Sequence, residues 1–160
     1  VSGGTELFRM GGRDVNARAY LSKFNFAGAD QEKKIGMLSG GERNRLHLAM
    51  ALKEEGNVLL LDEPTSNLDI RNQYQVLQIT RDLCREQNLT AMIVIHDLNL
   101  ALRFCDRFLL LREGAVYRYG GAEIFDADAL RDVYGVTGSI VDVQGQKLVL
   151  IDDEEKETRS

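Results

Sequence analysis

The chain has 160 residues, of which 44% are hydrophobic and 28% charged, a balance typical of one globular domain with a buried core. Its 25 acidic residues outnumber its 20 lysines and arginines, and the net charge of -5 disfavours nucleic-acid binding through a broad basic face. No apolar run approaches the roughly 20 residues that a membrane span needs, no signal peptide is recognisable, and Cys84 and Cys105 are expected to be buried free thiols.

Residues 1–37 begin with two glycine pairs and continue with an amphipathic stretch. Val15 and Ala19 recur at helical spacing, and Phe24 and Phe26 close the segment. This spacing predicts a helix from Val15 to Phe26.

The stretch "GMLSGGERNRLHLAM" (residues 36–50) has the glycine spacing of a P-loop in Gly36 and Gly41. However, Glu42 and Arg43 stand where a P-loop needs the lysine that neutralises phosphate and the hydroxyl that holds Mg²⁺. No Gly-Lys pair occurs in the 160 residues, so the chain contains no P-loop.

The same stretch predicts a helix that begins at a capping box, Ser39 with Glu42, and ends at Gly56. One interpretation is a helix cap and nothing more. The other depends on Gly40 and Gly41, which leave the first amides of the helix without covering side chains. Exposed N–H groups at the positive end of a helix dipole attract anions, so this helix would contact a phosphate that is already held elsewhere.

Two apolar runs predict neighbouring strands of a parallel sheet. They are "NVLLLDEP" (57–64) and "LTAMIVIHD" (89–97), with a helix predicted between them over residues 71–85. The order strand, helix, strand is a βαβ unit, and a strand that is apolar on both faces belongs inside a sheet. The inner face of the helix is expected to carry Val76, Leu77, Thr80, Leu83 and Cys84.

The remaining residues predict one helix that begins after Asp97, a hairpin over residues 107–120 around a Glu-Gly turn, and a short helix over 127–134. A final hairpin is expected from 140–143 and 147–151 around Gly145. Residues 152–160 form a charged tail.

Asp62, Glu63 and His96 lie at the carboxyl ends of the two predicted strands, where open α/β sheets bind ligands. Asp62 would hold Mg²⁺ or its water, and Glu63 would polarise the water that attacks a γ-phosphate. Pro64 is expected to hold Glu63 extended. His96 either hydrogen-bonds the γ-phosphate or is a neutral strand-end histidine bonded to backbone, and His47 faces outward with no assigned role.

Four motifs in order resemble the C-terminal part of an ATP-binding cassette (ABC) ATPase. "LSGGE" (38–42) resembles the signature motif, "VLLLDEP" (58–64) Walker B, "SNLD" (66–69) the D-loop and "IHD" (95–97) the switch histidine. The resemblance covers residues 13–151. It implies a partial P-loop NTPase fold of the α/β class, a parallel sheet flanked by helices, in which the Walker A half is missing. The expected divisions are a helical signature subdomain (1–56), a Walker B and switch-histidine core portion ending in a β-hairpin (57–151), and the tail (152–160).

The resemblance also implies the cofactors, ATP and Mg²⁺, and the role of each residue. Asp62 would bind Mg²⁺ through water, Glu63 would be the general base, and His96 would sense the γ-phosphate. The residues expected to contact ATP bound to a partner cassette are Leu38, Ser39, Gly40, Gly41 and Glu42. The D-loop would comprise Ser66, Asn67, Leu68 and Asp69, of which Asp69 would communicate across the dimer.

The two parts of the chain resemble different branches of the family. Residues 1–64 are similar to ABC-F translation factors of the translational-throttle type, whereas residues 65–151 are similar to importer ATPases for iron-siderophores and cobalamin. A join near Thr65 and Ser66 would make the chain a mosaic, either an engineered chimera or an assembly artefact.

Three functions remain open from the sequence. The first is an importer ATPase that forms a head-to-tail dimer of cassettes below a membrane permease, in the cytoplasm at the inner face of the membrane. The second is an ABC-F factor on the ribosome, which the acidic charge disfavours. The third is a non-catalytic truncated or chimeric fragment that offers its signature helix to a partner. Direct DNA binding is not expected, and without Walker A the chain alone is expected to be inactive.

Overall fold

The computed structural model describes residues 4–10, 12–54 and 56–152. The chain divides into two compact units, residues 1–95 and residues 96–160. No helix within the described ranges has the length and apolar character needed to cross a bilayer. The division into a signature subdomain and a core portion at residue 56 stays a prediction, and the charged tail beyond residue 152 lies outside the described residues.

A hairpin opens the first unit, and its second strand includes Val15 and Asn16, the first two residues of the predicted helix. Strands β1 (Leu7–Met10) and β2 (Arg13–Asn16) pair antiparallel, and helix α1 covers only Ala17–Ser22. The prediction of a helix from Val15 to Phe26 is therefore wrong at both ends. Val15 pairs with Phe8 in the hairpin, and Asn25, with a φ of 60°, lies in a turn that ends the segment.

Helix α2 (Gly40–Lys53) is the centre of the first unit, after two short 3-10 turns, η1 (Gly28–Glu32) and η2 (Ile35–Met37). It ends at Lys53, three residues before the glycine predicted to stop it. The buried hydroxyl of Tyr20 donates to the carbonyl oxygen of Ala49 at 2.8 Å, which ties α1 to α2, and burial raises the pKa of Tyr20 to about 12. The core around this contact contains Phe8, Ala17, Phe24, Phe26, Leu38, Leu48, Leu52, Leu59, Ile79 and Leu83.

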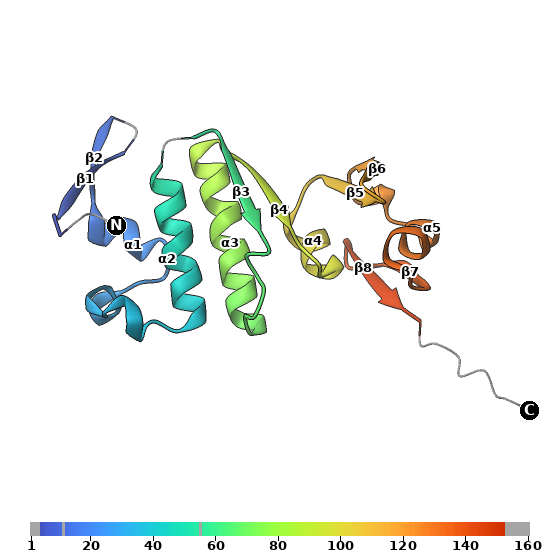
Figure 1. Cartoon of the computed structure of the whole chain (residues 1–160), viewed down its shortest axis with the longest axis horizontal. Helices are drawn as coiled ribbons and strands as arrows, with labels where there is room; N and C mark the ends of the chain where they lie inside the picture. The colour runs from blue at the N-terminus through green and yellow to red at the C-terminus, as the bar shows by residue number, and fades with distance from the viewer. Residues whose placement is uncertain (1–3, 11, 55, 153–160) are drawn as a thin grey trace, which may run out of the picture. The chain divides into compact units, whose positions relative to one another are not determined.

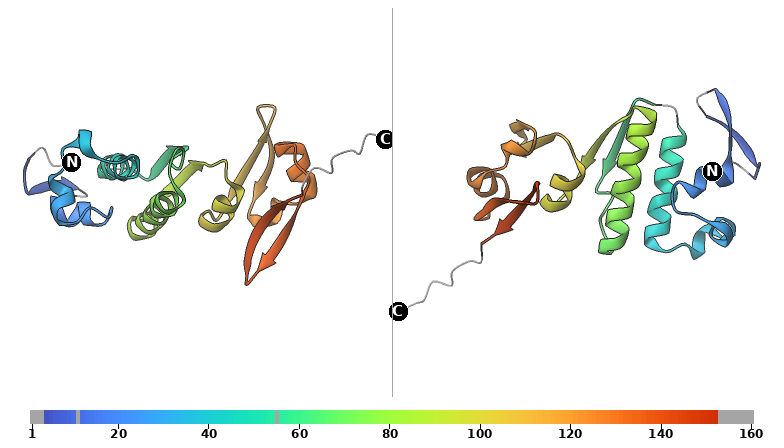
Figure 2. Two further views of the ribbon diagram at one scale, coloured as in Figure 1. Left: turned by 90° about the horizontal axis from the view of Figure 1, so that it is seen from below. Right: turned by 180° about the vertical axis from the view of Figure 1, so that it is seen from behind.

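The predicted βαβ unit is confirmed. Strands β3 (Val58–Asp62) and β4 (Thr90–Val94) are parallel neighbours, joined by helix α3 (Ile70–Gln87). Helices α2 and α3 lie side by side, with the strand pair next to α3 (Figures 1 and 2). The buried face of α3 consists of Val76, Leu77, Ile79, Thr80 and Leu83, and Cys84 is half-buried beside it.

One face of the β3–β4 pair is apolar and exposed. Leu59 on the inner face is 8% exposed, whereas Leu60 on the outer face is 68% exposed and its partner Met92 58%. The expectation that these strands are buried on both faces is therefore wrong for the described residues, which cover only one face.

The second unit contains the two predicted hairpins and the predicted helices. Its elements are α4 (Leu98–Phe104), β5 (Phe108–Arg112), β6 (Ala115–Gly120), η3 (Ala122–Ile124), α5 (Ala127–Ala129), the π turn η4 (Leu130–Tyr134), β7 (Gly138–Val143) and β8 (Gln146–Ile151). Each hairpin turns through two residues of positive φ, Glu113–Gly114 and Gln144–Gly145, as two-residue loops favour. Both cysteines of the chain are free, as predicted, but half-buried rather than buried.

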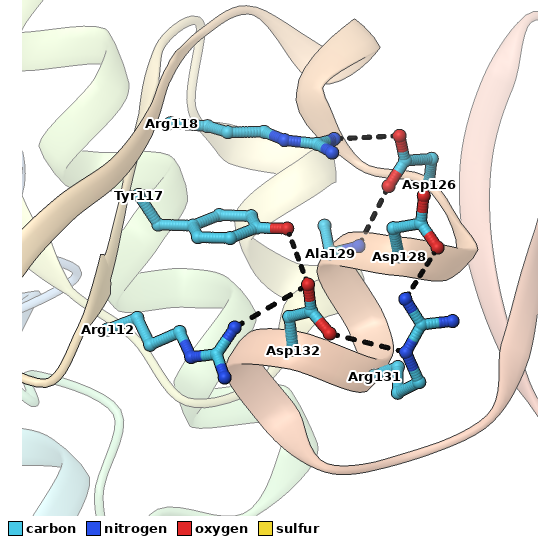
Figure 3. A network of polar contacts seen from close by, with 8 residues as sticks. All are labelled: Arg112, Tyr117, Arg118, Asp126, Asp128, Ala129, Arg131 and Asp132. Carbon is cyan, nitrogen blue, oxygen red and sulfur yellow. Dashed lines mark hydrogen bonds and ion pairs between the residues drawn. The ribbon is translucent and has the colours of Figure 1, made fainter.

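A polar network joins the β5–β6 hairpin to α5 and η4 (Figure 3). Asp132 accepts a hydrogen bond from the Tyr117 hydroxyl at 2.9 Å and pairs with Arg131 at 3.2 Å. Arg118 pairs with Asp126 at 2.7 Å, and Asp126 also caps α5. Because these groups are solvent-accessible, the network sets the geometry of the unit more than its stability.

Candidate functional site

The predicted capping box forms at the N-terminus of α2. The Ser39 hydroxyl accepts from the Glu42 amide at 3.2 Å, and the Glu42 carboxylate accepts from the Ser39 amide at 2.8 Å. Leu38, the residue before the cap, is buried in the core and its amide donates to the Ile35 carbonyl at 3.2 Å, so its side chain is not available to a ligand.

Lys33 compensates the charge of Glu42, a contact that the sequence reasoning missed. Its ammonium lies 2.8 Å from Glu42 and 2.7 Å from Asp30. The hydrogen bonds from Lys33 and then from Ser39 lower the pKa of Glu42 to about 2. Glu42 is therefore ionised, but its carboxylate is bonded to Lys33 and to the Ser39 amide. These bonds screen its negative charge from an anion at the helix end.

The two signature glycines have different surroundings. A methyl group built on Gly41 would overlap the side-chain amide of Asn72, which reaches over from α3. A methyl group on Gly40 would meet no described atom within 4 Å. Gly41 is therefore required by packing within the chain, whereas Gly40 leaves the first turn of the helix open to an outside group.

The backbone at Glu63 differs from the prediction. Its φ is 45°, in the left-handed region, so the expectation that Pro64 holds it extended is wrong. Proline disfavours the right-handed helical region at the preceding residue, and a turn determines which other region is used. Here the Ser66 amide donates to the Glu63 carbonyl at 3.1 Å, and the Ser66 hydroxyl donates to the Glu63 carboxylate at 2.7 Å. Such strained positions occur often at functional sites.

The D-loop residues form the connection from β3 to α3. Asn67 has a φ of 59°, and the Leu68 amide donates to the Thr65 carbonyl at 3.3 Å. Asp69 caps α3 by accepting from the amide and the side chain of Asn72, both at 2.8 Å, and these bonds lower its pKa.

A hollow of about 280 Å³ lies between α2 and the end of β3. It is lined by Asn44, His47, Leu48, Ala51, Leu61, Asp62, Glu63, Pro64 and Val76. Asn44 donates to the Pro64 carbonyl at 3.3 Å, which fixes the helix against the turn that carries the two acids. His47 is exposed, as predicted, but it lines this hollow; its spacing from Asn44 on α2 was the only sequence signal for that position.

His96 begins the second unit, whereas Asp62 and Glu63 lie in the first. The side chain of His96 is exposed, and the next residue, Asp97, caps α4 by accepting from the amides of Asn99 and Leu100. The predicted approach of His96 to the same phosphate as Glu63 stays a prediction.

The two acids at the end of β3, Asp62 and Glu63, fit Mg²⁺ that is held together with a nucleotide. No group of three His, Cys, Asp or Glu side chains within the described residues could hold a metal ion by itself. Mg²⁺ usually takes one or two carboxylates and completes its shell with water and substrate phosphates. Asp62, exposed at the end of β3, suits that arrangement.

The chain is similar to a transporter ATPase family profile and to three curated proteins. The ABC transporter family profile matches residues 6–66. An uncharacterized ABC transporter ATP-binding protein of Methanocaldococcus jannaschii, MJ0089, is 45% identical over 113 residues, which are 71% of this chain and 44% of the relative. The translational throttle protein EttA of Escherichia coli K12 is 47% identical over 97 residues, 61% of this chain and 17% of EttA. The iron(3+)-hydroxamate import protein FhuC of Bacillus subtilis is 43% identical over 111 residues, 69% of this chain and 41% of FhuC.

The solved structures that resemble this chain are also ABC transporters or their ATP-binding cassettes. A metal-chelate type ABC transporter in an inward-facing conformation aligns with a TM-score of 0.71 at 26% identity, over 85% of this chain and 55% of that one. The dimeric cassette MJ0796 bound to ADP and phosphate aligns with a TM-score of 0.55 at 31% identity, over 64% and 44%. The chain thus spans less than half the length of the curated relatives named above.

The comparisons bear on the suspected join near Thr65 and Ser66. A match that covers 113 of 160 residues cannot avoid the middle of the chain, so MJ0089 is similar on both sides of this point. The match lends no support to a mosaic origin.

Proposed function

We propose, because this chain belongs to the ATP-binding cassette (ABC) ATPases, that it supplies two parts of an ATP-hydrolysing site. The N-terminus of α2 serves ATP held by a partner cassette, and the carboxylates at the end of β3 serve ATP held in the chain's own cassette. The observation that carries this proposal is the capped start of α2. There Lys33 compensates the charge of Glu42, and Gly40 leaves the first turn of the helix open to an outside group.

The proposed chemistry divides the work among few residues. The Gly40 amide and the Ser39 hydroxyl donate hydrogen bonds to the γ-phosphate of the partner's ATP, aided by the helix dipole, whereas the Ser39 amide stays bonded to Glu42. Asp62 would hold Mg²⁺ together with ATP, through a water molecule, and the ion would supply neutralisation of the phosphate charge. Glu63 accepts a proton from the attacking water, and His96 donates a hydrogen bond to the γ-phosphate.

We propose import as the process that hydrolysis drives, of the iron-siderophore or cobalamin type, through a membrane permease. FhuC and the ferric enterobactin transport protein FepC of Escherichia coli support this choice, and each matches more of this chain than EttA does. Two cassettes, for whose pairing the dimeric MJ0796 structure is the precedent, would act in the cytoplasm below the permease, and we propose that they pair head to tail.

A second candidate is an ABC-F factor, which the 47% identity to EttA favours. The net charge of -5 opposes it because ribosome binding depends on phosphate contacts. Sedimentation with ribosomes at low and high salt separates the two. Binding that persists at moderate salt favours the ABC-F function, and its absence, together with permease-stimulated hydrolysis, favours import.

Signature donation can be tested in a mixed pair of cassettes. The partner carries a Walker A lysine, but its own signature serine is changed to arginine, so that only α2 of this chain can complete the partner's ATP site. Adding the chain should raise ATP hydrolysis, and Ser39→Arg should abolish the increase. Ser139→Arg, the same change at an exposed position of β7, is the control. An equal increase with Ser39→Arg would refute the proposed function.

A further inference from the structure

Arg45 is the only charged side chain that is buried within the part of the chain the structure describes; it is 7% exposed. It lies on α2, six residues after the cap, and its guanidinium stacks over the Phe26 ring at 5.7 Å. Burying a cation costs free energy unless hydrogen-bond partners compensate for the lost water. The partners of Arg45 therefore indicate why a charge is kept at this buried position.

The hydrogen bonds of Arg45 all go to neutral oxygens. Its Nε donates to the Phe24 carbonyl at 3.1 Å, and its Nη1 donates to the side-chain oxygens of Asn72 at 2.9 Å and Gln75 at 3.1 Å. Burial lowers the pKa of the guanidinium, as expected for a cation with no bonded carboxylate. Replacing a whole buried charged cluster by well-packed apolar side chains is often neutral or stabilising, so stability alone does not account for the arginine and its polar partners.

Asn72 connects Arg45 to the D-loop. Its side-chain oxygen accepts from Arg45, and its side-chain nitrogen donates to Asp69 at 2.8 Å. The opposite amide orientation would place NH₂ against the guanidinium and oxygen against the carboxylate, so the two bonds determine one orientation. The same amide packs against Gly41, at the start of α2. One side chain thus touches the signature helix, the buried arginine and the D-loop.

We propose that Arg45 is a positioning residue which, through Asn72, holds the D-loop at Asp69 in fixed orientation to the signature helix. The inference rests on the proposed function, because both elements then face the partner's nucleotide. The arginine acts on hydrolysis through another residue and touches no substrate itself.

Two neighbours of Arg45 provide a matched test in the mixed cassette pair. Asn72→Leu and Gln75→Met each remove one acceptor from Nη1 while preserving shape, but only Asn72 continues to Asp69. Asn72→Leu should lower kcat for the partner's hydrolysis about tenfold with KM for ATP little changed, as expected for lost coupling. Gln75→Met should leave kcat within about twofold. Thermal unfolding of both variants is measured in parallel.

Arg45→Met and Arg45→Lys complete the series. Arg45→Met should lower kcat about as much as Asn72→Leu does. It also removes the bonds to Phe24 and Gln75, so its thermal stability should fall further than that of Asn72→Leu while kcat does not. Arg45→Lys keeps the charge but cannot supply the same fork of donors, so it should restore kcat only in part. A drop in kcat that follows the loss of stability equally in the Asn72 and Gln75 variants would overturn the proposal, and so would an unchanged kcat in Asn72→Leu. If Ser39→Arg also has no effect, the proposed function has failed; if only the Asn72 and Arg45 variants lack one, this inference alone has failed.

Discussion

Alanine in place of Gly41 should destabilise the first unit relative to alanine in place of Gly40, although both substitutions add one methyl group to the same helix turn. The methyl group at position 41 would overlap the amide of Asn72, whereas the one at position 40 meets no described atom within 4 Å. Asn72 can move aside only by giving up its bond to the buried Arg45.

The expected difference in the free energy of unfolding between Gly40→Ala and Gly41→Ala does not depend on helix propensity, because both variants replace glycine by alanine in the same helix. Each substitution gains up to about 1 kcal/mol from replacing glycine in a helix. The Gly41→Ala variant additionally loses a hydrogen bond to a charged group, which is worth about 1.5–3 kcal/mol. We therefore expect Gly40→Ala to be neutral or stabilising, and Gly41→Ala to fall about 1.5–3 kcal/mol below it.

Urea unfolding followed by circular dichroism measures both variants. Asn72→Ala alone, and Asn72→Ala together with Gly41→Ala, complete a double-mutant cycle. Both chains lack the amide that the methyl group would meet and its bond to Arg45, so adding Gly41→Ala to Asn72→Ala should cost no further stability. Equal stability of Gly40→Ala and Gly41→Ala, or a penalty that persists without Asn72, would refute this reasoning.

Three further outcomes are expected. Ser39→Ala should lower the free energy of unfolding by about 1 kcal/mol through loss of the cap, and an unchanged urea midpoint would contradict the capping role. The pKa of Glu42, lowered to about 2, means that its contribution to stability is full above its unfolded pKa and is lost as the pH falls toward 2. Lys33→Met should flatten this loss in urea titrations at pH 6 and pH 3, and an unaltered pH dependence would rule out the Lys33 contact as its main cause. The 160-residue chain alone should not hydrolyse ATP, and turnover that disappears with Glu63→Gln would disprove this.

Sequence patterns predicted the structure correctly where it depends on residues only a few positions apart. The capping box of α2 joins residues three apart, and the turns at Gly114 and Gly145 need residues that tolerate positive φ. The βαβ unit follows from two apolar runs with a helical period between them. The N-terminal hairpin was missed because the spacing of Val15 and Ala19 is also compatible with a short strand that leads into a helix.

The candidate site could be predicted only in part. The acids after β3 and the start of α2 stand out by their motifs, but Lys33, Asn44 and His47 carry no motif that separates them from other surface residues. The left-handed backbone at Glu63 also escaped prediction, since Pro64 restricts only the right-handed region and the bonds from Ser66 then complete the turn.

The sequence by itself determined the capped helix start, the strand ends that carry the acids and the membership of the ABC ATPases, because each depends on residues close together in the chain. Tertiary structure alone decided that Gly41 faces Asn72 and that Arg45 is buried. It also decided that one amide joins the signature helix to Asp69. These contacts join residues of α2 to the D-loop and α3, and they exist only because the two helices pack side by side (Figure 1).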